Sequence, residues 1–499
     1  MTTTPSATTG SISSAGIGSG LDVKSIISSL MAVESQPLQL LQNAAGTVST
    51  EISAVGQIQS LTSTLSGTAH ALSSTSLWTQ TTSNTSDSTV VTADTSGGTA
   101  AAGDYSVSVQ QLAQGQTVTS SVAGGASLSA GTLTIQLGTY ATDTATPPNT
   151  TFTDAPNSSP TTITIAAGAT SLAAVRDSIN AANAGVSASI ISDANGSRLS
   201  LRSTTTGAVN GFQITATEAT DDGNPATGLS ALNFDGTTAG AANSQLTLNQ
   251  YAQNADATVN GIAVESSTNK LSNISDGLSL TLLKVSPTPV DVTVAADTAS
   301  MQKAITDFVS AYSALQSYIS LETKYDATTA VQPGTSRQDS PLTGDASVIG
   351  FQNQLRSIVN TTSTTSTMFA RLSDLGIAVQ SDGTLAVASS TKLTSALQHP
   401  DELSKLFTTY GTTNENTGIA IRFATMADNA VGVSGSLYTR ADGLRGELSR
   451  NQKQQDDMQT HLDATQARLT AQYQALDTTM SKMSALSSYV SQQVSLMEK

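Results

Sequence analysis

Side chains that could bind a metal ion or act in catalysis are scarce in this 499-residue sequence. Its three histidines, His70, His399 and His461, are not spaced from one another as metal ligands are. Cysteine is absent, which excludes disulfides, thiolate metal sites and cysteine nucleophiles. We therefore predict no metal site, and we expect the histidines to lie on solvated helices or loops.

Two short motifs resemble ligand-binding loops. Gly16-Ile17-Gly18-Ser19-Gly20 has part of a dinucleotide-binding loop, but no strand precedes it and its third glycine is misplaced. Asp221-Asp222-Gly223-Asn224 offers carboxylates to calcium, yet it lacks the 12-residue EF-hand spacing with a terminal glutamate, which favours a solvated turn. No Gly-x-Ser-x-Gly elbow stands at a strand–helix junction. We predict no catalytic residue and no cofactor, and hence a protein that is not an enzyme.

The composition also excludes several classes of partner. The net charge is −16, and clustered Lys and Arg that would bind nucleic acid or an anionic membrane surface are missing. No window approaches the ~18 apolar residues of a membrane-spanning helix, so we expect no membrane insertion. Only 12% of residues are charged and 4% aromatic, against a typical ~25% charged. Such a polar but weakly charged surface suits an extracellular polymer or strand-rich domains.

The N-terminal part predicts two helices. The first begins near Asp22, whose carboxylate suits an N-terminal turn, and Pro37 separates it from the second, which Ser35 or Gln36 can cap. Apolar residues at helical spacing mark the buried faces of both helices. In the first they are Val23, Ile26, Ile27 and Leu30, and in the second Leu41, Val48, Ile52 and Val55.

The C-terminal segment carries the clearest pattern. Six apolar residues are each seven apart, namely Leu462, Leu469, Leu476, Met483, Val490 and Met497, and the positions four later include Tyr473, Met480 and Val494 but also Gln466 and Ser487. This repeat predicts a coiled-coil helix of roughly 54 Å, at ~1.5 Å per residue. Because one such helix needs a partner, we expect it to pair with the helices of residues 22–75. The pattern fits both an ordinary bundle and intermolecular assembly, and its position at the extreme C-terminus favours assembly.

The middle of the chain changes to a period of two. Alternating runs that predict strands lie at 105–109, 133–137, 163–165, 199–201, 246–248, 259–264, 278–282 and 290–294, with a helix at 172–179. Asn195-Gly196, Asn260-Gly261 and Asp276-Gly277 are turn signals. The Thr- and Pro-rich stretch 139–160 predicts a loop. Helical period then returns at 301–319 and after Asp345, a hairpin follows at 376–387, and a further helix covers 393–397 and 403–407.

These patterns define the fold class as α+β. We expect a discontinuous helical-bundle and coiled-coil domain built from both termini, with all-β domains inserted in the middle. Residues 1–40 and 461–499 would form a terminal helical domain with a mobile N-terminus, and 41–78 with 300–460 a helical bundle with a β-hairpin. Residues 79–299 would form two small β-rich domains, an inner one (79–115 and 250–299) and an outer one (116–249).

Several motifs, in this order along the chain, are similar to one known family, the flagellar filament cap proteins (hook-associated protein 2). They are Gly16 to Val23 with Ile26-Ile27 and Leu30-Met31; Gly103 to Ala113; Thr162–Ile165 through Val175, Ile179-Asn180 and Gly185–Ala188, which resembles the repeat of flagellin and hook-associated proteins; Phe308 to Tyr312; Pro341 to Asp345; Leu375 to Ile377 with Asp382 to Leu385; and Gln472 to Met480 with Tyr489-Val490. The stretches 113–160 and 205–250 match nothing recognisable.

The resemblance implies a secreted, extracellular protein, exported through the flagellar type III channel to the distal tip of the filament, in agreement with the missing signal peptide. It implies a homo-oligomeric ring whose terminal helices are legs in the filament and whose β domains form a plate. Such a cap promotes flagellin folding and insertion and prevents flagellin leakage. The implied partners are further copies of the chain, flagellin, the hook–filament junction protein and a cytoplasmic export chaperone.

Two other functions share these features. A flagellin or junction-type filament subunit would have the same paired termini but would form long polymers alone. A tip adhesin would bind host mucin or glycans through the β-rich middle.

Overall fold

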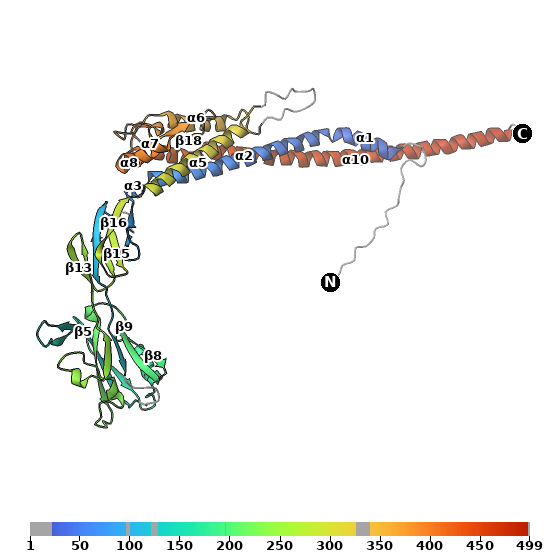
Figure 1. Ribbon diagram of the computed structural model, residues 1–499. Helices are drawn as coiled ribbons and strands as arrows, with labels where there is room; N and C mark the ends of the chain where they lie inside the picture. Colours follow the sequence, from blue (N-terminus) through green and yellow to red (C-terminus); the bar gives the residue numbers. More distant parts are fainter. Residues whose placement is uncertain (1–21, 96–99, 121–127, 195, 326–339, 498–499) are drawn as a thin grey trace. The chain divides into compact units, whose positions relative to one another are not determined.

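The computed structural model describes residues 22–95, 100–120, 128–194, 196–325 and 340–497 (Figure 1). It confirms the predicted α+β class. The chain forms two compact units, a helical one from residues 1–77 and 299–499 and a β-rich one from residues 78–298. The predicted mobile N-terminus, the Gly16–Gly20 motif and Asn195 lie outside the described residues.

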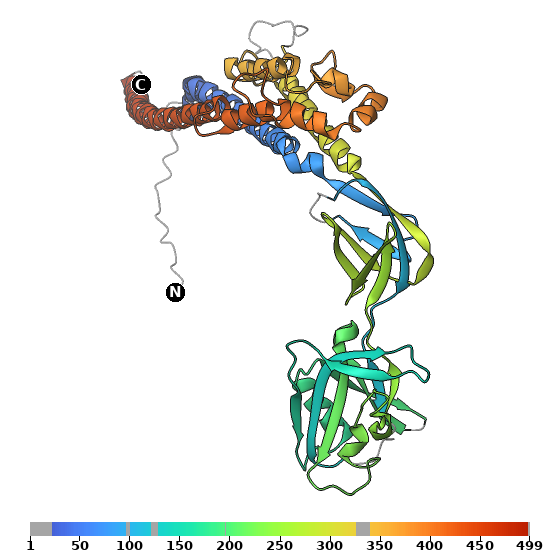
Figure 2. The same ribbon diagram turned by 90° about the vertical axis from the view of Figure 1, so that its left-hand side faces the viewer.

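The helical unit is built on three helices, α1 (Val23–Glu34), α2 (Gln36–Ser73) and α10 (Ser436–Met497). Asp22 caps α1 as expected, since its Oδ1 accepts from the Ser25 amide at 2.9 Å. Ser35 stands at the start of α2, but its hydroxyl donates back to the Ala32 carbonyl at 3.0 Å and does not cap the helix. Both views show α1 and α2 lying along α10 (Figures 1 and 2).

The rest of this unit packs against the same helices. It contains α5 (Thr298–Glu322), α6 (Ala346–Asn360), α7 (Ser390–Ala396), α8 (Pro400–Thr408), α9 (Ile419–Val431) and the hairpin of β17 (Ile377–Val379) and β18 (Leu385–Val387). Phe423 of α9 packs on Phe308 and Tyr312 of α5, with ring centroids 5.1 and 5.8 Å apart. The helix predicted over 393–397 and 403–407 is divided into α7 and α8, because Pro400 has no amide hydrogen and therefore begins a new helix. Helix α9 was not predicted.

The β-rich unit contains two cores. One lies between a five-stranded antiparallel sheet, in the order β1-β16-β3-β12-β13, and a three-stranded sheet, in the order β14-β15-β2. The strands are β1 (Thr81–Thr85), β2 (Val91–Asp94), β3 (Gly103–Gln111), β12 (Ala255–Val259), β13 (Ile262–Ser266), β14 (Lys270–Ser275), β15 (Leu278–Leu282) and β16 (Ser286–Ala296); the short helix α3 (Thr75–Thr79) precedes them. The predicted strand 259–264 is wrong, because it spans the turn between β12 and β13. There Asn260 (φ 49°) and Gly261 (φ 80°) take the left-handed conformations of a tight hairpin.

The second core lies between two four-stranded sheets and the helix α4 (Leu172–Ala181). One sheet has β5 paired with β10, β6 and β7, and the other has the order β11-β4-β9-β8. The strands are β4 (Thr117–Ser120), β5 (Gly131–Thr142), β6 (Thr150–Asp154), β7 (Thr161–Ile165), β8 (Val186–Asp193), β9 (Gly196–Ser203), β10 (Gly211–Glu218) and β11 (Leu246–Gln250). Short 3-10 turns lie at Ala208–Asn210, Leu229–Leu232 and Ala241–Asn243.

The predicted loop 139–160 is wrong over part of its length. Strand β5 continues to Thr142, and β6 pairs with it so that Tyr140 faces Phe152, with ring centroids 4.7 Å apart. The Thr142 and Thr150 hydroxyls meet at 2.8 Å at the end of the ladder. Cross-strand aromatic and threonine pairs stabilise a ladder although the stretch has few apolar residues.

Candidate assembly site

The terminal helices pair in antiparallel fashion. Glu51 of α2 forms an ion pair with Arg440 near the start of α10, at 3.1 Å. Further toward the N-terminus, Leu41 lies beside Met458 in one surface groove, and Val23 shares another groove with residues 459–474 of α10. As the chain is followed back from α2 to α1, its contacts therefore move outward along α10.

The predicted assembly residues fall into three groups. Val23, Val48, Val55 and Leu462 are buried, with 0 to 7% of their surface exposed. Ile26, Ile27, Leu41, Ile52, Leu469 and Tyr473 are half-buried. Leu30, Leu476, Met480, Met483, Val490, Val494 and Met497 are exposed, from 40% at Met480 to 84% at Met497. The structure thus places the first two groups along the paired helices and leaves Leu30 of α1 and the C-terminal residues of α10 uncovered by the described part of the chain.

The contact face of α10 begins well before the predicted repeat. It follows a spacing of alternately four and three residues, through Leu437, Ala441, Leu444, Leu448, Asn451, Gln455, Met458, Leu462, Thr465 and Leu469. The buried companion of Leu462 is Thr465, three residues later, whereas Gln466 is exposed. Asn451 and Gln455 interrupt the apolar pattern, and Gln455 donates to the Asn451 side-chain oxygen at 2.6 Å. These polar positions explain why residues 436–461 were missed.

A charged cluster fixes α10 to α2 and α6. Arg440 donates to Asp345 Oδ2 at 2.6 Å and to Glu51 Oε2 at 3.1 Å. Asp345 also caps α6, since its Oδ1 accepts from the Ser347 and Val348 amides. Burial raises the pKa of the Glu51 carboxyl, and Arg440 opposes this shift. One guanidinium therefore positions three helices.

Two grooves run along α10, one beside α1 and the start of α2, the other beside the start of α2 alone. The larger has a volume of about 800 Å³ and is lined by Val23, Ile27, Met31 and Leu38 on one side and by Leu462 and Gln466, among others, on the opposite side. The second has about 620 Å³ and includes Leu40, which is 69% exposed. Such shallow apolar grooves suit the packing of a further helix against these helices.

Past Gln474 the helix α10 carries an apolar surface that no described segment covers. We call this surface the terminal stripe; it consists of Leu476, Met480, Met483, Leu486, Tyr489, Val490, Val494, Leu496 and Met497, each at least 40% exposed. Leu486, Tyr489 and Leu496 were not predicted. At about 100° per residue, these three residues lie on a face of α10 next to that of the seven-residue repeat. They do not continue the repeat that includes Leu476, so only their spacing from one another could have predicted them. A helix with so wide an apolar arc is suited to more than one neighbour.

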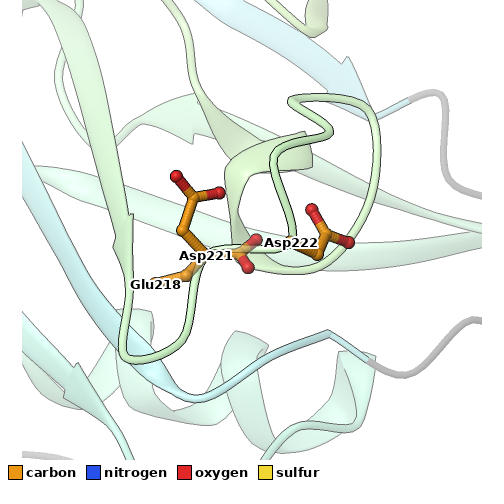
Figure 3. A group of neighbouring side chains, drawn as sticks. All are labelled: Glu218, Asp221 and Asp222. Carbon is orange, nitrogen blue, oxygen red and sulfur yellow. The ribbon is translucent and has the colours of Figure 1, made fainter.

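The acidic motif of the β-rich unit forms a cluster in the structure. Ligand oxygens of Glu218, Asp221 and Asp222 lie within 4.8 Å of one another (Figure 3). Each carboxylate already accepts a hydrogen bond from the local turn: Glu218 from the Ser230 amide, Asp221 from Gly223 and Asp222 from Asn224 and Thr227. These bonds lower the pKa of Asp222. The cluster therefore has a structural role in closing the turn.

Comparison with known proteins identifies the family. The flagellar hook-associated protein 2 of Escherichia coli O157:H7 is 33% identical over 486 residues, which cover 97% of this chain and 98% of that protein. The chain belongs to this family. The family models for the N-terminus and C-terminus of flagellar hook-associated protein 2 match residues 19–116 and 252–485, and the flagellin hook IN motif matches 149–205. The repeat that resembles flagellin, noted above within 162–188, lies inside that last match.

Other members agree with this result. The B-type hook-associated protein 2 of Pseudomonas aeruginosa is 29% identical and covers 94% of both chains. The crystal structure of the D1-D2-D3 domains of the flagellar cap protein FliD from Escherichia coli is 31% identical, with a TM-score of 0.56, and covers 79% of this chain and 99% of that one. The chain is thus a structural protein of the flagellar filament cap, located at the tip of the flagellum outside the cell. No helix among the described residues is apolar and long enough to cross a bilayer.

Proposed function

We propose that this chain closes a homo-oligomeric ring at the filament tip, where it promotes flagellin folding and insertion and prevents flagellin leakage. Membership of the cap family supports association with the filament and formation of an oligomer. The observation that carries the rest is the terminal stripe. A protein in water does not keep nine apolar residues exposed on one helix unless a partner covers them during function.

The division of α10 supports this proposal. Its first part, from Leu437 to about Gln474, is covered by α2 and α1 and belongs to the folded unit. Its last part, from Leu476 to Met497, is available for other chains. In this proposal residues 1–40 and 461–499 form the leg, residues 41–78 and 300–460 the bundle above it, and residues 79–299 the inner and outer plate domains.

The chemistry of the terminal stripe suits a partner that changes. Met480, Met483 and Met497 are flexible and polarisable, so they adapt to surfaces of different shape. As the filament grows, each leg has to leave one flagellin and engage another. Contacts made by methionine and valine include no ion pairs that must be broken. The free-energy cost of exchanging one flagellin for another is therefore small.

The other implied partners remain part of the same proposal and derive from the family resemblance. They are the hook–filament junction protein, a cytoplasmic export chaperone and, for an adhesive role of the outer domain, host mucin. We infer no catalytic activity, since the relatives are structural proteins of the flagellum.

The proposal is tested by charging the terminal stripe in the full chain. Met483→Asp with Val490→Asp places two carboxylates on the stripe. Ser481→Asp with Ser488→Asp is the matched control, because it places two carboxylates, also seven residues apart, on the opposite side of α10 at about 100° per residue. Both variants are expressed in a strain that lacks its own cap protein. The stripe variant should remain folded, but cells that express it should not swim and should release flagellin monomers into the medium. The control should swim.

Normal swimming of cells that express the stripe variant would contradict the proposal that the terminal stripe contacts the filament. Electron microscopy of the purified wild-type chain then tests the ring, for which we expect small closed rings. Long helical polymers formed by the chain alone would contradict the ring and favour a filament subunit.

A further inference from the structure

The helical unit contains a buried positive charge, Arg422, that has no counterion among the described residues. Arg422 of α9 is 5% exposed, and its Nη1 reaches the Thr361 carbonyl only at 3.5 Å. Its Nε and Nη2 are covered and have no hydrogen-bond partner within the described part of the chain. Burial alone lowers the pKa of this guanidinium. A buried charge with unmet donors is costly, so its retention requires a reason.

Arg422 stands in the wall of a cavity of about 780 Å³. The other lining residues include hydroxyls and amides from α6, α9 and the segment 410–417, and none of the described lining residues is acidic. A positive charge therefore lies at the cavity wall, with its Nε and Nη2 covered, and neutral hydrogen-bonding groups line the space around it. This combination matches a carboxylate, which pairs with a guanidinium through two parallel hydrogen bonds.

The rim of the cavity has the character of a protein-binding surface. Tyr410 lines it and is 84% exposed, and Val433, next to the lining residue Ser434, is 79% exposed. Tyrosine and arginine are enriched where a few side chains dominate the energy of a protein interface. An exposed aromatic ring beside a buried unpaired guanidinium indicates that the ligand is part of a polypeptide.

We propose that the Arg422 cavity receives the side-chain carboxylate of an aspartate or glutamate from a second copy of this chain. The chain has 37 acidic against 21 basic residues, so a neighbouring copy presents carboxylates in excess. The contact rests on the ring proposed above. On binding, the carboxylate enters the cavity, the guanidinium turns toward it, and the buried charge is neutralised within the interface.

Two changes in the full chain test the contact. Arg422→Met removes the charge and keeps most of the volume. Thr425→Glu adds a carboxylate three residues further along α9, on an exposed lining position from which it can pair with Arg422 within the same chain. We expect both to weaken self-association, measured by sedimentation, at least tenfold without lowering the melting temperature. Thr425→Gln, the neutral control, should associate as the wild type does.

The possible results separate the two proposals. If the wild type forms no ring, both the ring and this contact are contradicted. If the wild type and Thr425→Glu associate equally, the contact alone is overturned, and this holds even if Arg422→Met fails to fold. If the variants form rings but lose the ability to retain flagellin monomers on filaments, the carboxylate belongs to flagellin, and the assignment to a second copy is wrong.

Discussion

Arg440 Nε lies 2.6 Å from Asp345 Oδ2, which joins the long C-terminal helix α10 to the first turn of α6 across 95 residues of sequence. The Asp345 side chain is 6% exposed, and its other oxygen caps α6. Since the same guanidinium reaches Glu51 of α2, one side chain joins α10 to both α2 and α6. The start of α10 is therefore positioned by charge as well as by apolar packing.

Replacement of Arg440 should destabilise the helical unit. Arg440→Met leaves Asp345 and Glu51 without their cation in a partly buried site, and we expect the free energy of unfolding to fall by about 2 kcal/mol. Urea unfolding followed by circular dichroism measures it. Arg445→Met, an exposed position on the same helix, is the control and should change the free energy by less than about 0.5 kcal/mol. Equal effects of the two would show that the ion pair contributes nothing.

The carboxylate of Glu402 predicts how the stability of the helical unit depends on pH. Glu402 accepts from Lys405, Ser366 and Thr367, and these bonds lower its pKa to about 2. Because the folded pKa lies below the unfolded value, the stabilisation is complete above pH 4.5 and is lost as the pH falls toward 2. We expect the melting temperature of Glu402→Gln to be lower than that of the wild type at about pH 6 and equal to it near pH 2. A difference that does not change with pH would contradict this assignment.

Helices and strands could be predicted from the sequence where the apolar pattern is not interrupted by polar residues. Residues 462–497 have an uninterrupted repeat, and the helix there was predicted. Residues 436–461 belong to the same helix, but Asn451 and Gln455 occupy the contact face, and only the neighbouring helices show that they are buried or half-buried. Likewise β6 is held by the pair of Tyr140 and Phe152, a contact between strands that no local period reveals.

The candidate site was predictable only in part for a related reason. The repeat identifies which residues of α10 are apolar but not which of them a neighbour covers. Leu462 and Leu476 occupy the same position of the repeat, yet they are 4% and 46% exposed. The difference arises because α1 begins at Val23, which reaches only to about Gln474. The length of α1, rather than the seven-residue pattern of α10, determines which apolar residues of α10 are buried in the fold and which remain exposed.

The glycines of α2 should be tolerant of alanine. A Cβ at Gly46 or Gly56 would meet nothing within 4 Å, so neither glycine is required for close packing. Glycine inside a helix costs roughly 0.5–1 kcal/mol relative to alanine. We expect Gly46→Ala and Gly56→Ala each to raise the free energy of unfolding by that amount. If either change lowers it, the position contacts a partner that the single chain does not show.

The contrast between Leu462 and Leu476 gives the sharpest test of how α10 is divided. Leu462→Ala removes a buried side chain between α1 and α10 and should lower the free energy of unfolding by about 2–3 kcal/mol. Leu476→Ala removes the same atoms from the terminal stripe, which the described residues leave uncovered, and should change the free energy of unfolding by less than about 0.5 kcal/mol. Swimming assays should show a different effect. Leu476→Ala should impair motility although the purified variant is as stable as the wild type. If Leu476→Ala instead destabilises the purified chain as much as Leu462→Ala does, the terminal part of α10 is already covered in solution, and the residues we assign to the filament would belong to the fold.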